Sequence, residues 1–317
     1  MKQTTLAARL APILPSMRCP HCGGALTLLE SKSLHCASRH CYDLSVKGYV
    51  NLAPTHNQAA EKYDAALFAS RAHVFAGGYY TPVAQAIGDA IARYMPAFCT
   101  PPQAAGTLPN ADQALPDRQR SHTPAATSAT ANAPFLLDVG CGEGYYTRAL
   151  AARFPQAVFV GVDLSRDAIQ HAARLAPALN WFVADLTRLP FADASADVLL
   201  DVLTPADYRE FARVLKPEGL LVKVVPADDY LTQVRAAVAN HLRGKDFSNA
   251  RVLEHLRIHA NVLSQTTVRH TLPVTPQQAQ AFLRMTPMTF GLAEAVLADV
   301  TFSTITIALE VLVCRMR

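Results

Sequence analysis

The C-terminal part of this sequence predicts an α/β fold built on a doubly wound, mostly parallel sheet. From residue 135 onwards, short apolar runs alternate with segments of helical periodicity, a rhythm that is typical of βαβ units. In addition, a glycine-rich turn follows the first apolar run. Glycines at that position let a buried strand turn tightly into the following helix.

The expected elements follow one another in order along this part of the chain. Strands are predicted at 135–139, 157–163, 181–185, 197–202 and 219–225, and helices at 145–154, 165–176 and 207–216. The strands are almost entirely apolar, as in a parallel sheet that helices cover on both faces. The tail, 301–315, is rich in β-branched residues and is expected to close the sheet as its last strand.

A segment without apolar periodicity divides the chain. Residues 99–134 are rich in Pro, Ala and Thr, a composition that cannot bury a core and predicts a disordered linker. We therefore expect a small N-terminal module over 1–55, a helical connection over 56–98, the linker, and the α/β domain over 135–317.

Composition narrows the class of protein. Half of the residues are hydrophobic and 17% are charged, which is ordinary for a globular enzyme. The net charge of +4 permits a polyanionic partner without requiring one. No run of eighteen apolar residues occurs, so no membrane span is expected. Because no secretory signal is recognisable at the N-terminus either, we expect the protein to act in the cytoplasm.

Four of the seven cysteines lie within 19–41, and this clustering favours a metal site over disulfides. Cys19, Cys22, Cys36 and His40 form a C-x2-C-x13-C-x3-H pattern. This set of soft and borderline ligands suits one tetrahedral Zn²⁺ in a closed structural site. His35 and Cys41 are neighbouring alternatives for the fourth ligand, and the spacing favours His40.

The glycine-rich turn is the candidate cofactor site. Asp138 ends the first strand, and Gly140, Gly142 and Gly144 follow at alternate positions. This G-x-G-x-G spacing differs from the G-x-G-x-x-G fingerprint of dinucleotide sites, and the acidic residue before it suits a cationic ligand. We therefore predict S-adenosylmethionine at this turn.

Two further aspartates follow the next two strands. Asp163 ends the second strand, where its carboxylate can accept both ribose hydroxyls, and Asp185 ends the third, within reach of the adenine amine. The carboxyl ends of parallel strands meet at one edge of the sheet, so all three aspartates should face one ligand. The alternative is that each aspartate only caps the turn or helix that follows it.

The combination of motifs resembles the bacterial large-subunit rRNA (guanine-N1)-methyltransferases, the RlmA family. The segments that carry the resemblance are CPHCGG, CASRHCYDLSVKGYVNLAP, FASRAHVFAGGYYTPV, DVGCGEGYYTRA, LPFADASADV, ARVLKPEG and FLRMTPM. The resemblance covers nearly the whole chain outside 99–134. It implies a class I (Rossmann-like) methyltransferase with a small N-terminal zinc ribbon, which transfers a methyl group to N1 of a guanine in a hairpin loop of 23S rRNA.

The resemblance also implies further contacts with the cofactor. The family's tyrosine ahead of the x-Pro helix start matches Tyr80, and the Tyr-Thr pair after the glycine turn matches Tyr146 and Thr147. A contact after the fifth strand, a histidine in some members, falls on Tyr230. The segment 201–208 varies within the family, and it resembles members with N-x-L-S-P-A-N-Y there, some of them linked to macrolide resistance. Which guanine is methylated is therefore left open.

The acceptor chemistry requires a base, because guanine N1 carries a proton at neutral pH. Asp201, at the end of the fourth strand, is the expected catalytic residue by topology, and Asp207 is a weaker candidate. Asp201 could equally be a loop-capping or surface aspartate. Within the zinc module, Lys32, Arg39 and Lys47 are candidates for phosphate contacts.

Two other functions fit parts of the sequence. A small-molecule methyltransferase would use the same cofactor site but would leave the zinc module without a purpose. An inactive zinc-ribbon protein that only binds RNA conflicts with the intact glycine turn. The sequence does not decide between a monomer and a homodimer.

Overall fold

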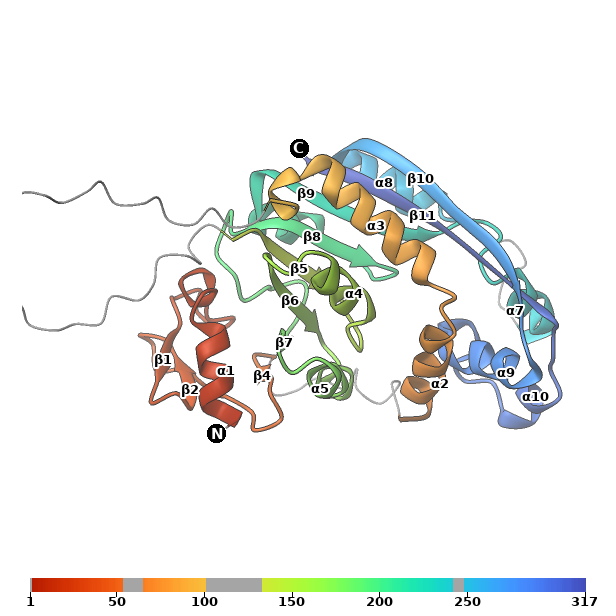
Figure 1. Ribbon diagram of the computed structural model, residues 1–317, viewed down its shortest axis with the longest axis horizontal. Helices are drawn as coiled ribbons and strands as arrows, with labels where there is room; N and C mark the ends of the chain where they lie inside the picture. Colours follow the sequence, from red (N-terminus) through yellow and green to blue (C-terminus); the bar gives the residue numbers. More distant parts are fainter. Residues whose placement is uncertain (1, 54–64, 101–132, 242–247) are drawn as a thin grey trace, which may run out of the picture.

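An eight-stranded sheet forms the centre of the molecule (Figure 1), in the order β10-β11-β9-β8-β5-β6-β7-β4. The computed structural model describes residues 2–53, 65–100, 133–241 and 248–317. The strands from β4 to β9 run parallel, whereas β11 and β10 are antiparallel to their neighbours. The strands are β4 (Val50–Asn51), β5 (Phe135–Val139), β6 (Val158–Asp163), β7 (Asn180–Val183), β8 (Ala196–Val202), β9 (Leu215–Pro226), β10 (Ala260–Pro273) and β11 (Thr304–Met316).

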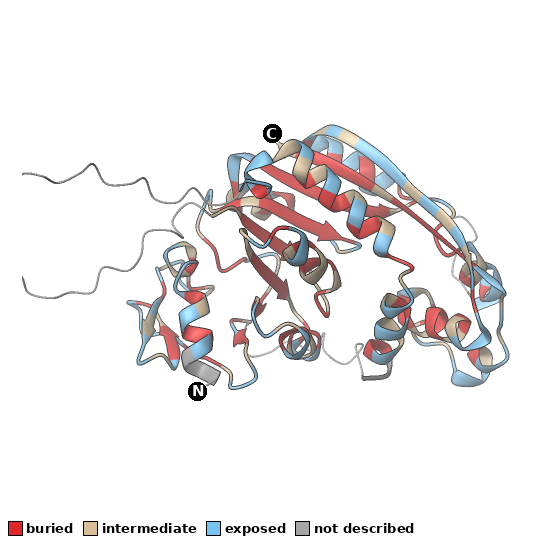
Figure 2. Cartoon of the chain, viewed as in Figure 1, coloured by how far each residue is buried: buried red, intermediate tan, exposed pale blue. Residues whose placement is uncertain are grey.

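Helices cover both faces of this sheet, and the central strands are almost completely buried (Figure 2). On the first face, α3 and α4 pack with Leu136, Val198 and Leu220, which are paired neighbours on β5, β8 and β9. On the second face, α1, α6 and α8 pack with the next residues along, Leu137, Leu199 and Leu221. The helices are α1 (Lys2–Leu10), α2 (Ala65–Ala76), α3 (Thr81–Tyr94), α4 (Tyr145–Arg153), α5 (Arg166–Leu175), α6 (Tyr208–Val214), α7 (Thr232–Ala237), α8 (Ala250–His259), α9 (Pro276–Met285) and α10 (Glu294–Ala298).

The N-terminal segment forms a layer on the second face of the sheet. Its own small antiparallel sheet contains β1 (Thr27–Leu29), β2 (Ser33–His35) and β3 (Cys41–Asp43). Leu10 and Met17 share one buried cluster with Phe182 and Phe191 of the α/β domain, and Met17 also bridges Phe191 through the backbone. In addition, β4 lies beside β7 as an edge strand of the main sheet. The zinc module and the α/β domain therefore share one core.

The C-terminal strands differ from the sequence prediction. The tail does enter the sheet, as β11, but β10 pairs with its outer side and forms the edge instead. The helix predicted at 207–216 ends at Val214, because Leu215 already pairs with Ala196 as the first residue of β9. Between β10 and β11, α9 and α10 extend away from the sheet, and α2 packs against α9 (Figure 1).

Residues 101–132, most of the predicted linker, lie outside the described residues. Within the part of the chain that the structure describes, no helix has the length and apolar character needed to cross a bilayer.

Candidate cofactor pocket and zinc site

A cavity of about 1110 Å³ lies at the carboxyl edge of the sheet. From β5 the chain proceeds outward to β6 and β7, then returns to place β8 on the other side of β5. Such a reversal of strand order is where open α/β sheets bind ligands. The volume exceeds the range of roughly 300–1,000 Å³ of ordinary small-molecule sites, so the cavity can accept more than one small ligand.

The glycine turn after β5 forms the floor of this cavity. Gly140 has a φ of 68°, and a Cβ there would lie 2.2 Å from Oγ1 of Thr204. Gly142 has a φ of 56°, and its backbone N–H donates to Oδ2 of Asp163 over 2.8 Å. Both positions therefore require glycine, Gly140 by close approach as well as by its left-handed backbone.

The three aspartates predicted from successive strands all line the cavity. Each also holds local structure: Asp138 accepts a hydrogen bond from Thr147 Oγ1, and Asp163 accepts one from the Ser165 N–H at 2.8 Å. Asp185 accepts from the Thr187 N–H at the same distance. Capping and ligand binding are compatible, because an ionised carboxylate offers about four acceptor sites.

Burial sets the electrostatics of this half of the cavity. It raises the pKa of Asp138 to about 7, against the opposing hydrogen bond from Thr147, and nearby Asp163 and Asp201 raise it further. Burial also raises the pKa of Asp163 and of Glu143. A bound cation would restore the charged form of these groups.

Three tyrosines predicted to contact the cofactor meet on the first face of the sheet. Tyr80, Tyr146 and Tyr230 all line the cavity, and the hydroxyls of Tyr80 and Tyr230 are 2.7 Å apart. The Tyr146 hydroxyl is buried and has no hydrogen-bond partner among the described residues. Thr147, in contrast, is fully buried and does not line the cavity; it acts on Asp138 through its hydroxyl.

Helix α2 supplies a wall of the cavity whose individual residues the sequence did not predict. Phe68, Arg71 and Phe75 line the cavity from it, and Phe75 stacks on Tyr145 with ring centroids 4.2 Å apart. Arg71 Nη1 lies 3.5 Å from Oε2 of Glu143, which belongs to the glycine turn. The run FASRAHVF, quoted above for its family resemblance, was the available signal.

The predicted catalytic residue is placed differently from expectation. Asp201 is neither a surface nor a loop residue: it is fully buried in β8 and does not line the cavity. Its Oδ2 accepts a hydrogen bond from Lys223 Nζ over 2.7 Å, and Lys223 lines the cavity in its place. Burial raises the pKa of Asp201 to about 7, although Lys223 opposes this. Asp207, the weaker candidate, caps α6 by accepting from the Glu210 N–H.

Leu203 is a second feature of this region that the sequence did not reveal. It lines the cavity directly after β8 with a φ of 55°, a left-handed conformation that is strained for a branched side chain. Its N–H is held by the carbonyl of Val224 at 3.0 Å. Strain of this kind concentrates at functional sites.

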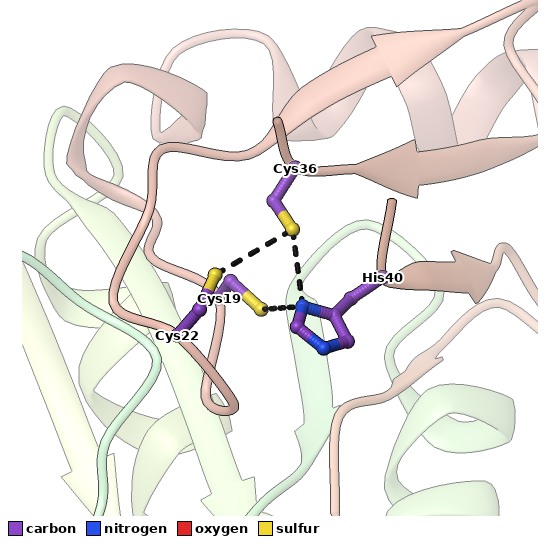
Figure 3. Close-up of side chains that lie close together, drawn as sticks. All are labelled: Cys19, Cys22, Cys36 and His40. Atoms are coloured by element: carbon purple, nitrogen blue, oxygen red, sulfur yellow. Dashed lines mark hydrogen bonds between the residues drawn. The ribbon is translucent and has the colours of Figure 1, made fainter. Parts of the chain in front are cut away.

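The zinc ligands predicted from spacing converge on one point (Figure 3). The ligand atoms of Cys19, Cys22, Cys36 and His40 all lie within 4.8 Å of one another. The Sγ of Cys36 is 3.3 Å from His40 Nδ1 and 3.6 Å from the Sγ of Cys22. Ligands about 2.0–2.3 Å from a tetrahedral zinc are roughly 3.5–3.8 Å apart, so the donor set fits this metal.

The surroundings of the cluster fit thiolate ligands. A hydrogen bond from the Gly24 backbone, followed by one from Ser38, lowers the pKa of Cys22 to about 6. The Tyr42 hydroxyl lies 3.1 Å from Cys19 Sγ, a supporting contact that the spacing did not reveal. The alternatives His35 and Cys41 lie outside the cluster and contact each other instead, at 3.3 Å.

Two family models match the chain. The one described as "RlmA, N-terminal" covers residues 17–60, and the one described as "Methyltransferase domain" covers residues 136–219. A Bacillus subtilis (strain 168) protein with the name "Putative 23S rRNA (guanine-N(1)-)-methyltransferase YxjB" is 30% identical over 304 residues, which are 93% of this chain and 95% of that protein. The chain belongs to the 23S rRNA (guanine-N1)-methyltransferase family.

Two further relatives have names of the same kind. A Micromonospora griseorubida protein with the name "Putative 23S rRNA (guanine-N(1)-)-methyltransferase" is 32% identical, over 87% of each chain. The 23S rRNA (guanine(748)-N(1))-methyltransferase of Streptomyces fradiae is 30% identical, over 81% of this chain and 79% of its own. The family and fold class inferred from the motifs are thereby confirmed. S-adenosylmethionine and one structural zinc are the cofactors of this family member, in agreement with the acidic pocket and the Cys3His cluster.

Proposed function

We propose that this protein methylates N1 of a guanine in a hairpin loop of 23S rRNA, with S-adenosylmethionine as the donor, in the cytoplasm. The observation that carries the proposal is the coexistence, in one protein, of a Cys3His cluster that shares the core of the sheet and a cavity slightly larger than ordinary small-molecule sites. Relatives with 23S rRNA (guanine-N1)-methyltransferase names extend over nearly the same length. S-adenosylmethionine supplies an electrophilic methyl group when it is bound.

The proposed cofactor contacts follow from the placement of the acidic and aromatic residues. Gly140, Gly142, Asp138, Asp163 and Asp185 surround the half of the cavity beyond β5, β6 and β7. Their carboxylates suit the cationic donor, its ribose hydroxyls and its adenine amine. Tyr80, Tyr146 and Tyr230 close this half from the first face, and Thr147 holds Asp138 in position.

The remaining half of the cavity is proposed to take the acceptor base. A guanine must leave its stack to reach a buried methyl group, and the protein then aligns N1 with the donor. The zinc ribbon is proposed to bind RNA and not to take part in the chemistry, because four protein ligands leave zinc no open position. Among its three candidate cations, Lys32 pairs with Glu30 at 3.4 Å and Lys47 donates to Gln170 at 2.9 Å. Arg39 is exposed and has no ion-pair partner in the described part of the chain.

The test is a methyl-transfer assay with tritiated S-adenosylmethionine and 23S rRNA that lacks its natural methylation. Label should enter the RNA, and primer extension should stop at one guanine, because a methyl group on N1 blocks base pairing. Domain fragments of the rRNA then locate the hairpin. Label in a small molecule but not in RNA would overturn the proposal in favour of a small-molecule methyltransferase. Cofactor binding without any transfer would favour an inactive RNA-binding protein.

A further inference from the structure

The cavity has two electrically different halves. Carboxylates line the part beyond β5, β6 and β7, together with Arg71, which pairs with Glu143. Lys223 of β9 and Arg251 of α8 line the part on the other side of the strand reversal. Arg251 is exposed at the mouth, and Lys223 lies deep, with 3% of its side chain exposed. A cationic donor suits the first half, and a polyanionic acceptor suits the second.

Lys223 is an unusual residue at its position. It interrupts the apolar strand β9, where its neighbours Val222 and Val224 are fully buried. Burying an ammonium group is costly unless it is paired and hydrogen-bonded. Two of its three N–H groups have partners: Asp201 Oδ2 at 2.7 Å and the Thr204 carbonyl oxygen at 2.8 Å. Among the described residues the third N–H has no acceptor.

The two partners fix the direction of the ammonium group. Asp201 lies directly beside Lys223 in the parallel pairing of β8 and β9, and the Thr204 carbonyl belongs to the turn that follows β8. Because Lys223 lines the cavity and only two of its N–H groups have acceptors in the described part of the chain, the remaining N–H is available to a ligand. This ligand must offer an acceptor oxygen, because an ammonium group can only donate.

We infer that Lys223 is a catalytic residue that donates a hydrogen bond to O6 of the acceptor guanine. The inference rests on the proposed function and adds the group that recognises and activates the base. Asp201 is then a positioning residue, which holds Lys223 and does not itself reach the base.

The chemistry of the transfer explains why a cation is needed at O6. Guanine N1 must lose its proton to expose a lone pair, and the negative charge that results is shared with O6. The N1 proton passes to water. N1 then forms a bond to the methyl carbon as the carbon–sulfur bond breaks, and the sulfur keeps the electron pair. A preorganised ammonium group facing O6 stabilises charge where it develops.

The first experiment measures single-turnover methylation of the 23S rRNA hairpin that the wild type modifies. Lys223→Met should slow the step by about 10- to 100-fold, the range expected for loss of a charged hydrogen bond, while the Kd for S-adenosylmethionine stays within about twofold. Lys216→Met is the matched control: this lysine is also on β9 but pairs with Asp197 at the surface, with 44% of its side chain exposed. It should leave the rate unchanged.

The second experiment tests the O6 contact without any reaction. With S-adenosylhomocysteine bound, wild type should prefer the hairpin with guanine over one with 2-aminopurine, which lacks O6, by about tenfold or more. Lys223→Met should show no preference, and Lys216→Met should keep it.

The outcomes separate the two levels of the argument. Wild type that fails to methylate guanine N1 overturns the proposed function. Wild type that methylates it, with rate and O6 preference retained in Lys223→Met, overturns this inference alone. If Lys223→Met loses cofactor binding, the same measurements on Asp201→Asn/Lys223→Met decide, because that variant leaves no buried charge unpaired.

Discussion

The affinity for S-adenosylmethionine should depend on pH through Asp138, which lies 2% exposed at the floor of the cavity. Burial raises the pKa of this carboxyl group from 3.8 to about 7 in the ligand-free protein. Below that pH, binding of a cationic ligand that needs the ionised carboxylate must therefore be coupled to the loss of a proton from Asp138 to solvent. Between pH 5 and 7 the ligand keeps its own charge, because an α-amino group titrates at about 7.7–8.0.

The size of the pH effect on binding follows from how far the pKa of Asp138 is raised. Each pH unit corresponds to about 1.4 kcal/mol, so ionising Asp138 in the empty pocket costs about 4 kcal/mol relative to the unfolded chain. Because the pKa of Asp138 is raised in the folded state, its protonated carboxyl group favours folding. This contribution to the free energy of unfolding is complete below about pH 4 and disappears as the pH rises through 7. For binding, the apparent Kd should increase by up to about tenfold for each pH unit below 7, and by about 50-fold between pH 7 and pH 5, because half of Asp138 is already protonated at pH 7.

Isothermal titration calorimetry from pH 5 to pH 7.5 measures this dependence directly. Asp138→Asn, which can still accept the hydrogen bond from Thr147, should bind weakly and with little pH dependence. Asp207→Asn is the control, since this aspartate caps α6 and does not line the cavity; this variant should keep the pH dependence of the wild type. An equal Kd at pH 5 and pH 7 in the wild type would refute the reasoning.

Three further perturbations test the rest of the site. Cys22→Ser should lose zinc, as measured by metal analysis, and should lower the Tm of the whole protein in one transition, because the ribbon shares its core with the sheet. Cys41→Ser, outside the cluster, should keep the zinc and the wild-type Tm, and full zinc in Cys22→Ser would contradict the ligand set. Gly142→Val should weaken S-adenosylmethionine binding by about 5- to 100-fold, since a branched residue at a φ of 56° costs about 1–3 kcal/mol. Gly291→Val, at a φ of 84°, should lower the stability but not the affinity, and calorimetry distinguishes the two. Replacing Lys32, Arg39 and Lys47 together by Ala should weaken RNA binding and leave the cofactor affinity unchanged. The slope of log K for RNA binding against log salt concentration should become less steep by about 0.7–0.9 for each lost phosphate contact, and equal slopes in wild type and variant would remove the ribbon from RNA recognition.

The central strands were predictable because they are buried on both faces. The bounds of β5, β6 and β8 follow from apolar runs, the first two of which end next to Gly140 or at Asp163, and each agrees with the structure within one residue. The edge strand β10 was not predicted, because its burial alternates along its length and no apolar run marks it. The period-two pattern of Val, Thr and Leu within 260–273 was the signal.

The residues of the site likewise fall into those that the sequence predicts and those that only the tertiary structure brings together. Asp138, Asp163 and Asp185 were predictable because strand ends of a parallel sheet converge by topology alone. The relation between Asp201 and Lys223 was not predicted, because it depends on which residues of β8 and β9 lie side by side. Two opposite charges inside neighbouring apolar strands were the available signal. The contact of Tyr42 with Cys19 depends in the same way on tertiary packing.

The shared core limits how this chain can be engineered. A zinc ribbon that hung on a linker could be exchanged between relatives as a cassette to redirect RNA specificity. Here Met17 pairs with Phe191 and Val50 with Phe182 of β7, so a transplanted ribbon would meet a foreign surface on the host sheet. A chimera would have to carry the facing residues of the second face with it. Specificity and catalytic scaffold must then change together, by matched substitutions on both sides of one buried interface.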